Sequence, residues 1–452
     1  MPELTGVISE NVSVNIRTID LRGVALNREN IAALIPRART NSESISSQVS
    51  ALLSEVRSSG EVALRAQTEK FDGVTGHLIR VPEHAIEASV DNLSAELRSA
   101  IAESISRVKK VCESQLPNST STSFGTGSTV RTRWQPIERV GLYVPGGKAV
   151  YPSSVVMNVV PAQIAGVTSI ALVSPPQLVF QGQIHPTTLA TAGMLGVTEI
   201  YAIGGAAAIG SLAFGVPELG LSKVDLITGP GNIWVATAKR LVRGSVGIDA
   251  EAGPTEILII ADDSANPEFV ARDLVSQAEH DELACAVLVT NSVQLAESVE
   301  EQLPIICAST RHSDRICASL NGQQSAIVLV DDLDAAASFS NVYAPEHLEL
   351  MVSNPEQLMS QIQSAGAIFF GEYSPVSLGD YLAGSNHVLP TGGQARFSAG
   401  LGIHTFLRPQ QIIHYDRNGL EQVSRQLVTF ANEEQLPGHG EAVASRFQNG
   451  FM

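Results

Sequence analysis

The chain has 452 residues, of which 44% are hydrophobic and 17% charged, a globular composition that is long enough for two or more domains. Its formal net charge of −17 excludes the usual electrostatic basis for binding nucleic acid or an anionic membrane, because Lys and Arg patches capture such polyanions. Its cysteines are few and widely scattered, which excludes a dense disulfide framework and favours a reducing compartment, so we expect a cytoplasmic protein.

The chain begins with Met1–Arg22, which is polar and lacks the basic start and apolar centre of a signal peptide. We expect residues 1–30 to form an N-terminal arm. Helices are predicted over 41–60 and 82–115, where apolar residues recur at three- and four-residue spacing. The Ser/Thr/Gly-rich segment Asn118–Ser128 follows them, and we expect it to be a loop that carries the chain between domains.

From residue 140 onward, strand and helix patterns alternate, which predicts parallel α/β sheets. The first block predicts strands at 140–144, 169–173, 199–203, 226–228 and 256–260, and helices at 154–165, 188–195 and 233–243. The second block predicts helices at 268–280 and 292–303, and strands at 284–290, 325–330 and 367–370. Residues 410–452 again show a helical pattern and predict an appended arm. The most apolar stretch, 153–173, is too interrupted by polar residues and proline to span a membrane.

Glycine-rich turns lie at the predicted strand ends: Gly141–Gly147, Gly204-Gly205, Thr228–Asn232 and Ala252–Thr255. Ligands bind at the carboxyl ends of strands in open α/β sheets, where glycine lets the backbone approach a phosphate. None of the turns matches GxGxxG, so an ordinary tight turn is the better interpretation of any single one. Together they favour a nucleotide-like ligand.

The segment Ser276–His280 lies at the end of a predicted helix, and the i, i+3 spacing of Gln277 and His280 places both side chains on one helical face. This arrangement suits two ligands of one cation. A surface glutamine and histidine near a helix C-terminus is the alternative, since the helix dipole favours a cationic imidazole there.

The segment Tyr343–His347 places an acid beside an imidazole after a proline. We expect Pro345 to open a helix whose first turn contains Glu346 and His347. The pair could act as general base and acid, or it could be an ordinary helix start.

Two further segments and one cysteine bear on the chemistry. The polar, glycine-punctuated loop Gly379–His387 contains an Asp and a His, and it is either functional or a solvated turn. The segment Glu434–His439 shows only a helix stop followed by a new helix. Cys285 lies in an apolar run and is interpreted as a buried strand residue. Water activated by a carboxylate is therefore a better nucleophile than a thiol, and any bound metal would have His, Asp and Gln ligands, which suit Zn²⁺ or Mn²⁺.

Taken together and in this order, these segments resemble histidinol dehydrogenases over about residues 17–446; the most specific stretches are 141–147, 229–232, 252–256, 276–280, 343–348 and 379–390. The resemblance implies a zinc-containing homodimer that oxidises L-histidinol to L-histidine with two NAD⁺, without releasing the aldehyde. It also implies an α/β fold of two incomplete Rossmann-like parallel-sheet domains, with a helical N-terminal segment and a helical C-terminal dimerisation arm. We expect 31–128 and 257–398 to form the first domain, 129–256 the second and 399–452 the arm.

The resemblance also assigns roles to single residues. The positions that match zinc ligands are Gln277, His280, Asp380 and His439, the last supplied by the partner subunit, and the zinc would hold the substrate's imidazole and amine. Glu346 and His347 match the catalytic pair: His347 would take the alcohol proton as hydride leaves, and Glu346 would activate water. The positions that match substrate contacts are Thr255, His387 and Glu434, beside the zinc ligands and His347.

Tyr143 and Asn232 match contacts to NAD. Ala207 departs from the family, which often has a glutamine there that contacts the dinucleotide, so only the backbone is left to cradle it at this position. Two rival functions stay open at this stage. A zinc hydrolase could use Glu346 as base, although it leaves the glycine turns unexplained, and a non-catalytic ligand-binding protein could have kept the fold.

Overall fold

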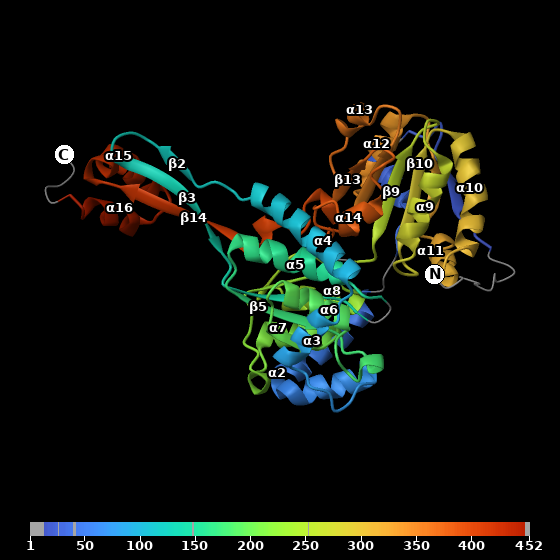
Figure 1. Cartoon of the computed structure of the whole chain (residues 1–452). Coiled ribbons are helices and arrows are strands. Elements are labelled where there is room, and N and C mark those ends of the chain that lie inside the picture. Colours follow the sequence, from blue (N-terminus) through green and yellow to red (C-terminus); the bar gives the residue numbers. More distant parts are fainter. Residues whose placement is uncertain (1–12, 26, 39–41, 147–148, 252, 448–452) are drawn as a thin grey trace.

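The computed structural model describes residues 13–25, 27–38, 42–146, 149–251 and 253–447. These residues form a six-stranded sheet, a five-stranded sheet and a separate three-stranded sheet. Figure 1 shows the six-stranded sheet at upper right, the five-stranded sheet below it and an arm that projects to the left. The two larger sheets are wholly parallel, which confirms the predicted α/β class. No helix in the described part of the chain is both long and apolar enough to span a membrane.

The five-stranded sheet has the order β6-β5-β4-β7-β8. Its strands are β4 (Arg139–Tyr143), β5 (Ser169–Ser174), β6 (Ile200–Ala202), β7 (Leu226–Thr228) and β8 (Gly247–Ile248). The connecting helices are α5 (Pro152–Ala165), α6 (Pro186–Met194), α7 (Gly205–Phe214) and α8 (Ile233–Val242). The chain runs outward from β4 to β6 and then returns to the other side of β4, so the strand order reverses between β4 and β7. This is the point at which such sheets bind ligands.

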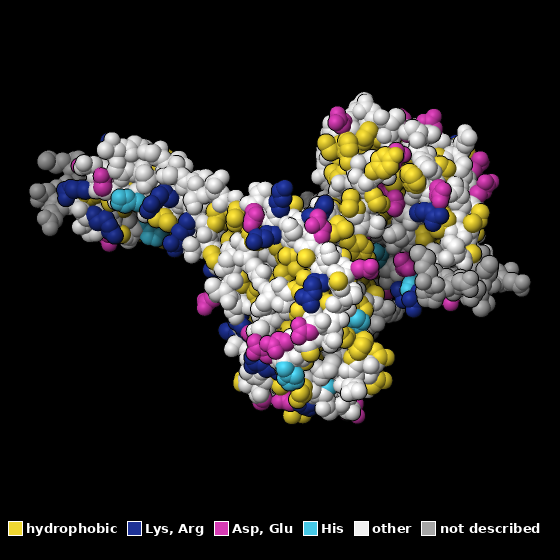
Figure 2. Space-filling model, in the orientation of Figure 1, with side chains coloured by type: hydrophobic (Ala, Val, Ile, Leu, Met, Phe, Trp, Pro, Cys, Tyr) yellow, Lys and Arg dark blue, Asp and Glu magenta, His cyan; other side chains and the backbone are white. Residues whose placement is uncertain are grey.

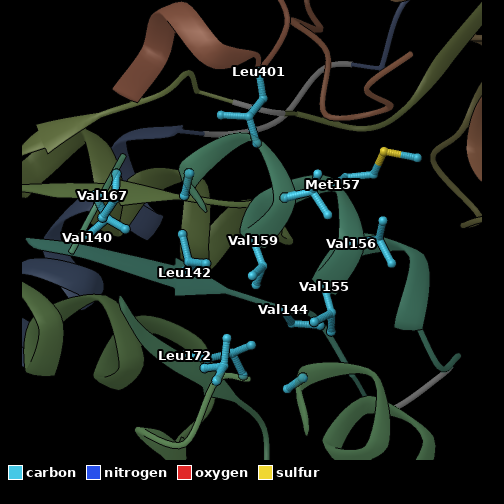
Figure 3. Close-up of a cluster of buried hydrophobic side chains, with 14 of the residues drawn as sticks. Val140, Leu142, Val144, Val155, Val156, Met157, Val159, Val167, Leu172 and Leu401 are labelled. Atoms are coloured by element: carbon cyan, nitrogen blue, oxygen red, sulfur yellow. The ribbon is translucent and has the colours of Figure 1, made fainter. Parts of the chain in front are cut away.

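The core of this part lies between β4 and α5. Figure 3 shows Val140 and Leu142 of β4 together with Val155 and Val159 of α5 in one apolar cluster, and all are fully buried. Leu401, far along the chain, joins the same cluster. Helix α5 is apolar on nearly every face, and most of its residues are buried. The surrounding packing therefore fixes the position of its first turn.

Three helices near the N-terminus cover this sheet's helices. The predicted helical segments are confirmed as α2 (Ser42–Asp72), α3 (Glu83–Asp91) and α4 (Ala95–Ser114), with a non-helical Gly60 inside α2. Helix α2 packs against α7 and α8, α3 against α6, and α4 against α5. The sequence grouped residues 31–128 with 257–398, whereas these contacts join the helices to the five-stranded sheet. An amphipathic pattern reveals an apolar face but not which partner covers it. The domain boundaries themselves stay a prediction.

The six-stranded sheet has the order β1-β11-β10-β9-β12-β13. Its strands are β1 (Arg17–Asp20), β9 (Glu256–Ala261), β10 (Cys285–Thr290), β11 (Ala326–Leu329), β12 (His347–Met351) and β13 (Ala367–Phe370). Its helices are α1 (Arg28–Leu34), α9 (Pro267–Ala278), α10 (Val293–Ala308), α11 (Ser313–Leu320), α12 (Leu333–Tyr343), α13 (Pro355–Met359) and α14 (Val376–Tyr381). Every residue of β9, β10 and β12 is buried, Cys285 included, as expected for parallel strands covered on both faces.

The expected N-terminal arm is only partly described, because residues 1–12 and 26 lie outside the described residues. Within the rest of it, β1 pairs in parallel with β11 and forms one edge of the six-stranded sheet.

The projecting arm contains β2 (Thr120–Ser123), β3 (Ser128–Pro136), β14 (Leu407–Tyr415), α15 (Arg417–Glu433) and α16 (Pro437–Ala444). The three strands are antiparallel in the order β14-β3-β2. Two predictions are therefore wrong: the expected loop 118–128 contributes strand β2, and the expected helix begins only after β14. The residues of β2 are polar and exposed, so no alternation of apolar residues marks the strand, which is specified by pairing to β3 alone.

The segment 343–347 also differs from its prediction. Helix α12 ends at Tyr343, and Ala344 adopts a left-handed conformation with φ 51°. Pro345 then leads into strand β12, which begins at His347 and pairs with both β9 and β13. Pro345 follows the end of α12 and precedes a strand. A strand forms here because the residues after Pro345 pair with β9 on one side and with β13 on the other. The remaining short 3₁₀ turns are 178–180, 217–219, 394–396 and 403–406.

A buried ion pair ties the segment between α1 and α2 to the six-stranded sheet. Arg37 Nε lies 2.6 Å from Glu256 Oε1 at the start of β9, and Arg37 Nη2 donates to the carbonyl of Tyr343 at 2.7 Å. Burial raises the pKa of Glu256 to about 7, an effect that the Arg37 charge opposes. The guanidinium thus offsets part of the cost of burying this carboxylate.

Replacing Arg37 with Met should lower the free energy of unfolding by about 3–5 kcal/mol at neutral pH, because Glu256 is left buried without its partner. The loss should shrink as the pH falls. The pKa of such a carboxyl is higher in the folded protein than in the unfolded protein. The free energy of unfolding therefore falls as the pH rises between these two pKa values. Guanidinium denaturation at several pH values measures both effects. R272M is the matched control, since it breaks the exposed Arg272–Glu268 pair and should cost less than about 1 kcal/mol. Equal losses in the two variants would contradict a special role for Arg37.

Candidate active site

Most of the residues singled out in the sequence converge at one edge of the six-stranded sheet. The amino ends of β9 and β12 lie there, and the helices that run antiparallel to the strands bring their C-terminal ends to the same edge. Thr255 and Glu256 lie at the start of β9, and Glu346 and His347 lie at the start of β12. Gln277 lies in the last turn of α9, His280 follows two residues after its end, and Asp380 lies in α14. The chain therefore assembles this edge from four separate elements.

Glu346 is held by two hydrogen bonds to one oxygen. Its Oε2 accepts from Thr255 Oγ1 at 2.6 Å and from the Glu256 backbone N–H at 2.8 Å. Burial raises the pKa of the Glu346 carboxyl to about 8, and these two hydrogen bonds oppose the rise. A carboxyl with a pKa near neutrality can both take and return a proton, as a general base must.

The imidazole of His347 lies beside this carboxyl, with Nδ1 3.5 Å from Glu346 Oε2. The same Nδ1 lies 2.9 Å from the carbonyl oxygen of Glu256, which can only accept a hydrogen bond, so Nδ1 carries the proton. Nε2 is then the basic nitrogen. Burial lowers the pKa of His347, which keeps the ring neutral and able to take up a proton.

Gln277 links this couple to a candidate metal centre. Its Nε2 donates to Thr255 Oγ1 at 2.6 Å, and the hydroxyl passes the hydrogen bond on to Glu346. Its Oε1 is buried and has no hydrogen-bond donor among the described residues. A buried amide oxygen without a partner is costly unless a ligand satisfies it, and a cation would do so.

His280 and Asp380 complete the set that one chain brings together. His280 Nδ1 lies 3.3 Å from the carbonyl of Gln277, which leaves Nε2 free, and Nε2 lies 3.9 Å from Asp380 Oδ2. An amide oxygen, an imidazole nitrogen and a carboxylate suit a divalent cation such as Zn²⁺. The described residues contain no group of three or more His, Cys, Asp and Glu side chains that could hold a metal ion. Of the predicted ligands at this edge, only His280 and Asp380 are of these types, because the remaining one is Gln277. Gln277, His280 and Asp380 therefore fit such a cation, for which they would supply part of the coordination shell.

His387 joins this edge to the five-stranded sheet. Its Nδ1 lies 3.0 Å from the backbone carbonyl of Asp380, and its Nε2 lies 3.2 Å from Ser154 Oγ in the first turn of α5. Asn386 adds a second tie, donating to the carbonyl of Met157 at 2.6 Å. Because α5 follows the carboxyl end of β4, the amino edge of one sheet meets the carboxyl edge of the other at this point.

The glycine-rich turns lie mainly on that carboxyl edge, after β4, β6 and β7. The fourth turn, 252–255, precedes β9 instead; Ala252 and also Gly147 lie outside the described residues. Gly229 has φ 117°, and a side chain there would overlap the carbonyl oxygen of Tyr143. Its N–H donates to Asp249 at 2.8 Å and its carbonyl accepts from buried Lys239 at 2.9 Å. This turn therefore has a fixed shape that only glycine permits.

The residues expected to contact NAD lie around these turns. Tyr143 ends β4 and is buried, and Ala207 is buried in the first turns of α7. Asn232 is exposed and caps α8, accepting from the backbone N–H groups of Trp234 and Val235. Their positions are compatible with a dinucleotide at this edge, and their contacts to it stay a prediction.

His439 and Glu434 are not brought to this edge by their own chain. His439 lies in α16 and Glu434 directly follows α15, and both are exposed. Figure 1 shows these helices at the far end of the arm, away from α9 and α14. Figure 2 shows Lys, Arg and His side chains on the visible face of the same arm, where the strands carry exposed Arg131, Arg133 and His414.

Sequence reasoning missed several residues that hold the site. Glu256 positions both catalytic candidates through its backbone, Arg37 neutralises its side chain, and Ser154 contacts His387. Glu256 had a signal, since it is an acidic residue at the start of an otherwise apolar strand. Arg37 and Ser154 had none, because nothing local predicts which distant residue they contact.

The chain is similar to known proteins along nearly its whole length. The family model described as histidinol dehydrogenase matches residues 35–447. The histidinol dehydrogenase of Leifsonia xyli subsp. xyli is 57% identical over 433 residues, covering 96% of this chain and 99% of that protein. That of Mycobacterium tuberculosis is 51% identical, covering 95% and 98%. The crystal structure of histidinol dehydrogenase from Elizabethkingia anophelis matches with a TM-score of 0.90 and 34% identity, covering 96% of this chain and 99% of that one.

The matches agree with the resemblance seen in the sequence, and the solved structure shares the architecture described above. The chain therefore belongs to the histidinol dehydrogenase family.

Proposed function

We propose that this protein oxidises L-histidinol to L-histidine through an enzyme-held aldehyde, consuming two NAD⁺ and one water, in the last two steps of histidine biosynthesis. The observation that carries the proposal is the buried Glu346–His347 couple, whose carboxyl and imidazole are each fixed by the backbone of Glu256. Two such bases side by side suit a reaction that needs both alcohol deprotonation and water activation. Free cysteines, two of them fully buried, are consistent with a cytoplasmic location.

The metal site would be formed by Gln277 through its unpaired Oε1, His280 through Nε2 and the carboxylate of Asp380, with His439 of the partner subunit as the fourth ligand. Zinc, when bound, supplies a fixed charge that orients the substrate's imidazole and amine. The hydrogen bond from Gln277 to Thr255 couples the position of this site to that of Glu346. Thr255 and His387, together with Glu434 of the partner subunit, would contact the substrate.

The first oxidation removes a proton and a hydride from the primary alcohol. Nε2 of His347 makes no hydrogen bond to the described residues, in contrast to Nδ1, and it would take the hydroxyl proton while the hydride from the same carbon passes to NAD⁺. The products are the aldehyde and NADH, and the proton leaves through the imidazole. The lowered pKa of His347 favours its release before the second step.

The second oxidation requires water. Glu346 removes a proton from a water molecule as its oxygen attacks the aldehyde carbon, and it returns that proton to the aldehyde oxygen, which gives the hydrate. The hydrate passes its hydride to a second NAD⁺ while His347 takes one hydroxyl proton, and the acid that forms loses its remaining proton to solvent to give the carboxylate. The thiol of Cys285 is buried and burial raises its pKa to about 12, so it is no competing nucleophile.

The dinucleotide would bind on the carboxyl edge of the five-stranded sheet. Tyr143, Asn232 and the backbone around Ala207 lie at the turns of this edge, and the fixed Gly229 turn offers close backbone approach. Ser154 and His387 join this edge to Asp380 at the other, so the nicotinamide end of the ligand would lie next to the substrate.

Incubation with L-histidinol and NAD⁺ should produce two NADH for each histidine formed, followed by absorbance and by chromatography of the product. Chelation should abolish turnover, and adding back Zn²⁺ or Mn²⁺ in parallel identifies which ion supports it better. Absence of NADH with the metal present would favour the zinc hydrolase alternative. Full activity after complete metal removal would contradict the positioning role of the ion.

Replacing Glu346 with Gln should slow aldehyde oxidation by roughly 10²–10⁴-fold and alcohol oxidation much less, because only the former needs activated water. Single-turnover experiments with histidinol, and separately with histidinal, resolve the two steps by the NADH that each forms. E268Q, which changes an exposed glutamate in α9, is the control and should match the wild type. Equal slowing of both steps in E346Q would refute this division of labour.

A mixed-dimer experiment tests whether His439 acts in the partner's site. E346Q and H439N should each be nearly inactive alone. When co-expressed with different tags, the mixed dimers contain one site with both residues intact, so about a quarter of the wild-type activity should return if pairing is random. Purification through both tags isolates the mixed species. No recovery in that species would place His439 outside the partner's site.

A further inference from the structure

A pair of buried carboxyl groups lies behind the candidate active site and takes no part in the chemistry described above. Asp273 lies in α9 and Glu349 in β12, and both are buried. The two side chains are neighbours, and a proton on Glu349 would let this carboxyl donate a hydrogen bond to Asp273. Burial raises the pKa of both groups, to about 6 for Asp273 and well above the usual value for Glu349, so burial favours a protonated carboxyl in the pair.

The same glutamate also holds a third element. Its Oε1 accepts the backbone N–H of Val376 at 2.7 Å, the first residue of α14. Its Oε2 is buried and receives no donor from the described residues, as fits an oxygen that itself carries the proton. One carboxyl pair therefore joins α9, β12 and the start of α14.

Each of the three residues in these contacts lies in the same helix or strand as an active-site residue and faces the same side. Asp273 precedes Gln277 by four residues in α9, and Val376 precedes Asp380 by four in α14, so each pair lies on one helical face about 6 Å apart along the axis. Glu349 follows His347 by two residues in β12 and points to the same side of the sheet. The carboxyl pair thus lies one helical turn behind Gln277, Asp380 and His347.

We propose that Asp273 and Glu349 are positioning residues whose shared hydrogen bond fixes the relative placement of α9, β12 and α14, and thereby of the metal ligands Gln277 and Asp380 beside His347. The proposal rests on the proposed function for the identity of those ligands. A hydrophobic pair could fill this space, but it would leave the Val376 N–H without an acceptor and let α14 shift. Partners behind the ligands of a metal site typically change its affinity by about 10–100-fold when removed.

The test uses Glu349→Leu and Glu349→Gln in the full-length protein. E349L keeps the volume but loses both hydrogen bonds, whereas E349Q can still donate to Asp273 and accept from Val376. Amide hydrogen exchange on the metal-free protein should show faster exchange in residues 376–381 and 277–282 for E349L, and wild-type exchange there for E349Q. Zinc affinity, measured by competition with a chelator, should fall at least about 10-fold in E349L and stay within about threefold in E349Q.

Asp262→Ala is the matched control. Asp262 is another buried carboxyl of the same sheet, but it lies at the opposite end of β9, where it binds Ser264 and Ser353. D262A should lower the melting temperature without changing zinc affinity or exchange at 376–381. If E349L does not fold, Asp273→Ala takes its place. Because it leaves the bond between Glu349 and Val376 intact, faster exchange is expected at 277–282 and not at 376–381, and zinc affinity should again fall at least about 10-fold.

Unchanged exchange and unchanged zinc affinity in the variant would overturn the proposal, as would E349Q behaving like E349L. A wild-type protein that binds no zinc would instead overturn the metal site of the proposed function. The exchange measurement would then still decide whether the carboxyl pair positions the two helices.

Discussion

The backbone of a single residue, Glu256, holds both members of the candidate catalytic couple, Glu346 and His347. Its N–H donates to the carboxyl of Glu346 and its carbonyl accepts from the imidazole of His347. These bonds are possible because β9 and β12 are adjacent parallel strands with Ile257 opposite His347. The spacing of the carboxyl and the imidazole is thus set by sheet geometry, which is far stiffer than a loop. Arg37 completes the arrangement by neutralising the Glu256 side chain at the same point.

The edge at which the couple lies is unusual for a parallel sheet. Open α/β sheets generally bind ligands at the carboxyl ends of their strands, and the glycine turns of the five-stranded sheet follow that rule. The couple and the candidate metal ligands lie at the amino ends of β9 and β12. The two sheets therefore contribute opposite edges to one site, joined by His387, Asn386 and the first turns of α5. A dinucleotide held by one edge and a small substrate held by the other would meet between them.

Burial has opposite effects on the two bases, and both effects favour catalysis. It raises the pKa of Glu346 to about 8, which makes the carboxylate a stronger base, and it lowers the pKa of His347, which keeps the imidazole neutral. The arm contributes in another way, since it extends away from its own site and carries His439 and Glu434 in exposed positions. Within the arm, β14, β3 and β2 pair with one another and α15 packs against α16.

The sequence alone determined the elements with a strong internal period and the chemistry of the side chains. Buried strands and amphipathic helices of the two sheets were predicted because their apolar residues repeat locally. The helix expected to run to His280 ends at Ala278, and His280 lies in the turn that follows. The order of the motifs was specific enough to indicate the family. Tertiary structure decided the rest: that 343–347 turns from a helix into a strand, that 118–128 and 410–415 pair as strands, and that α2, α3 and α4 cover the five-stranded sheet. It also decided that Arg37 meets Glu256 and that Asp273 meets Glu349. Each of these depends on a contact between residues far apart in the chain, and a local pattern contains no information about which distant group will satisfy a buried charge or an unpaired strand.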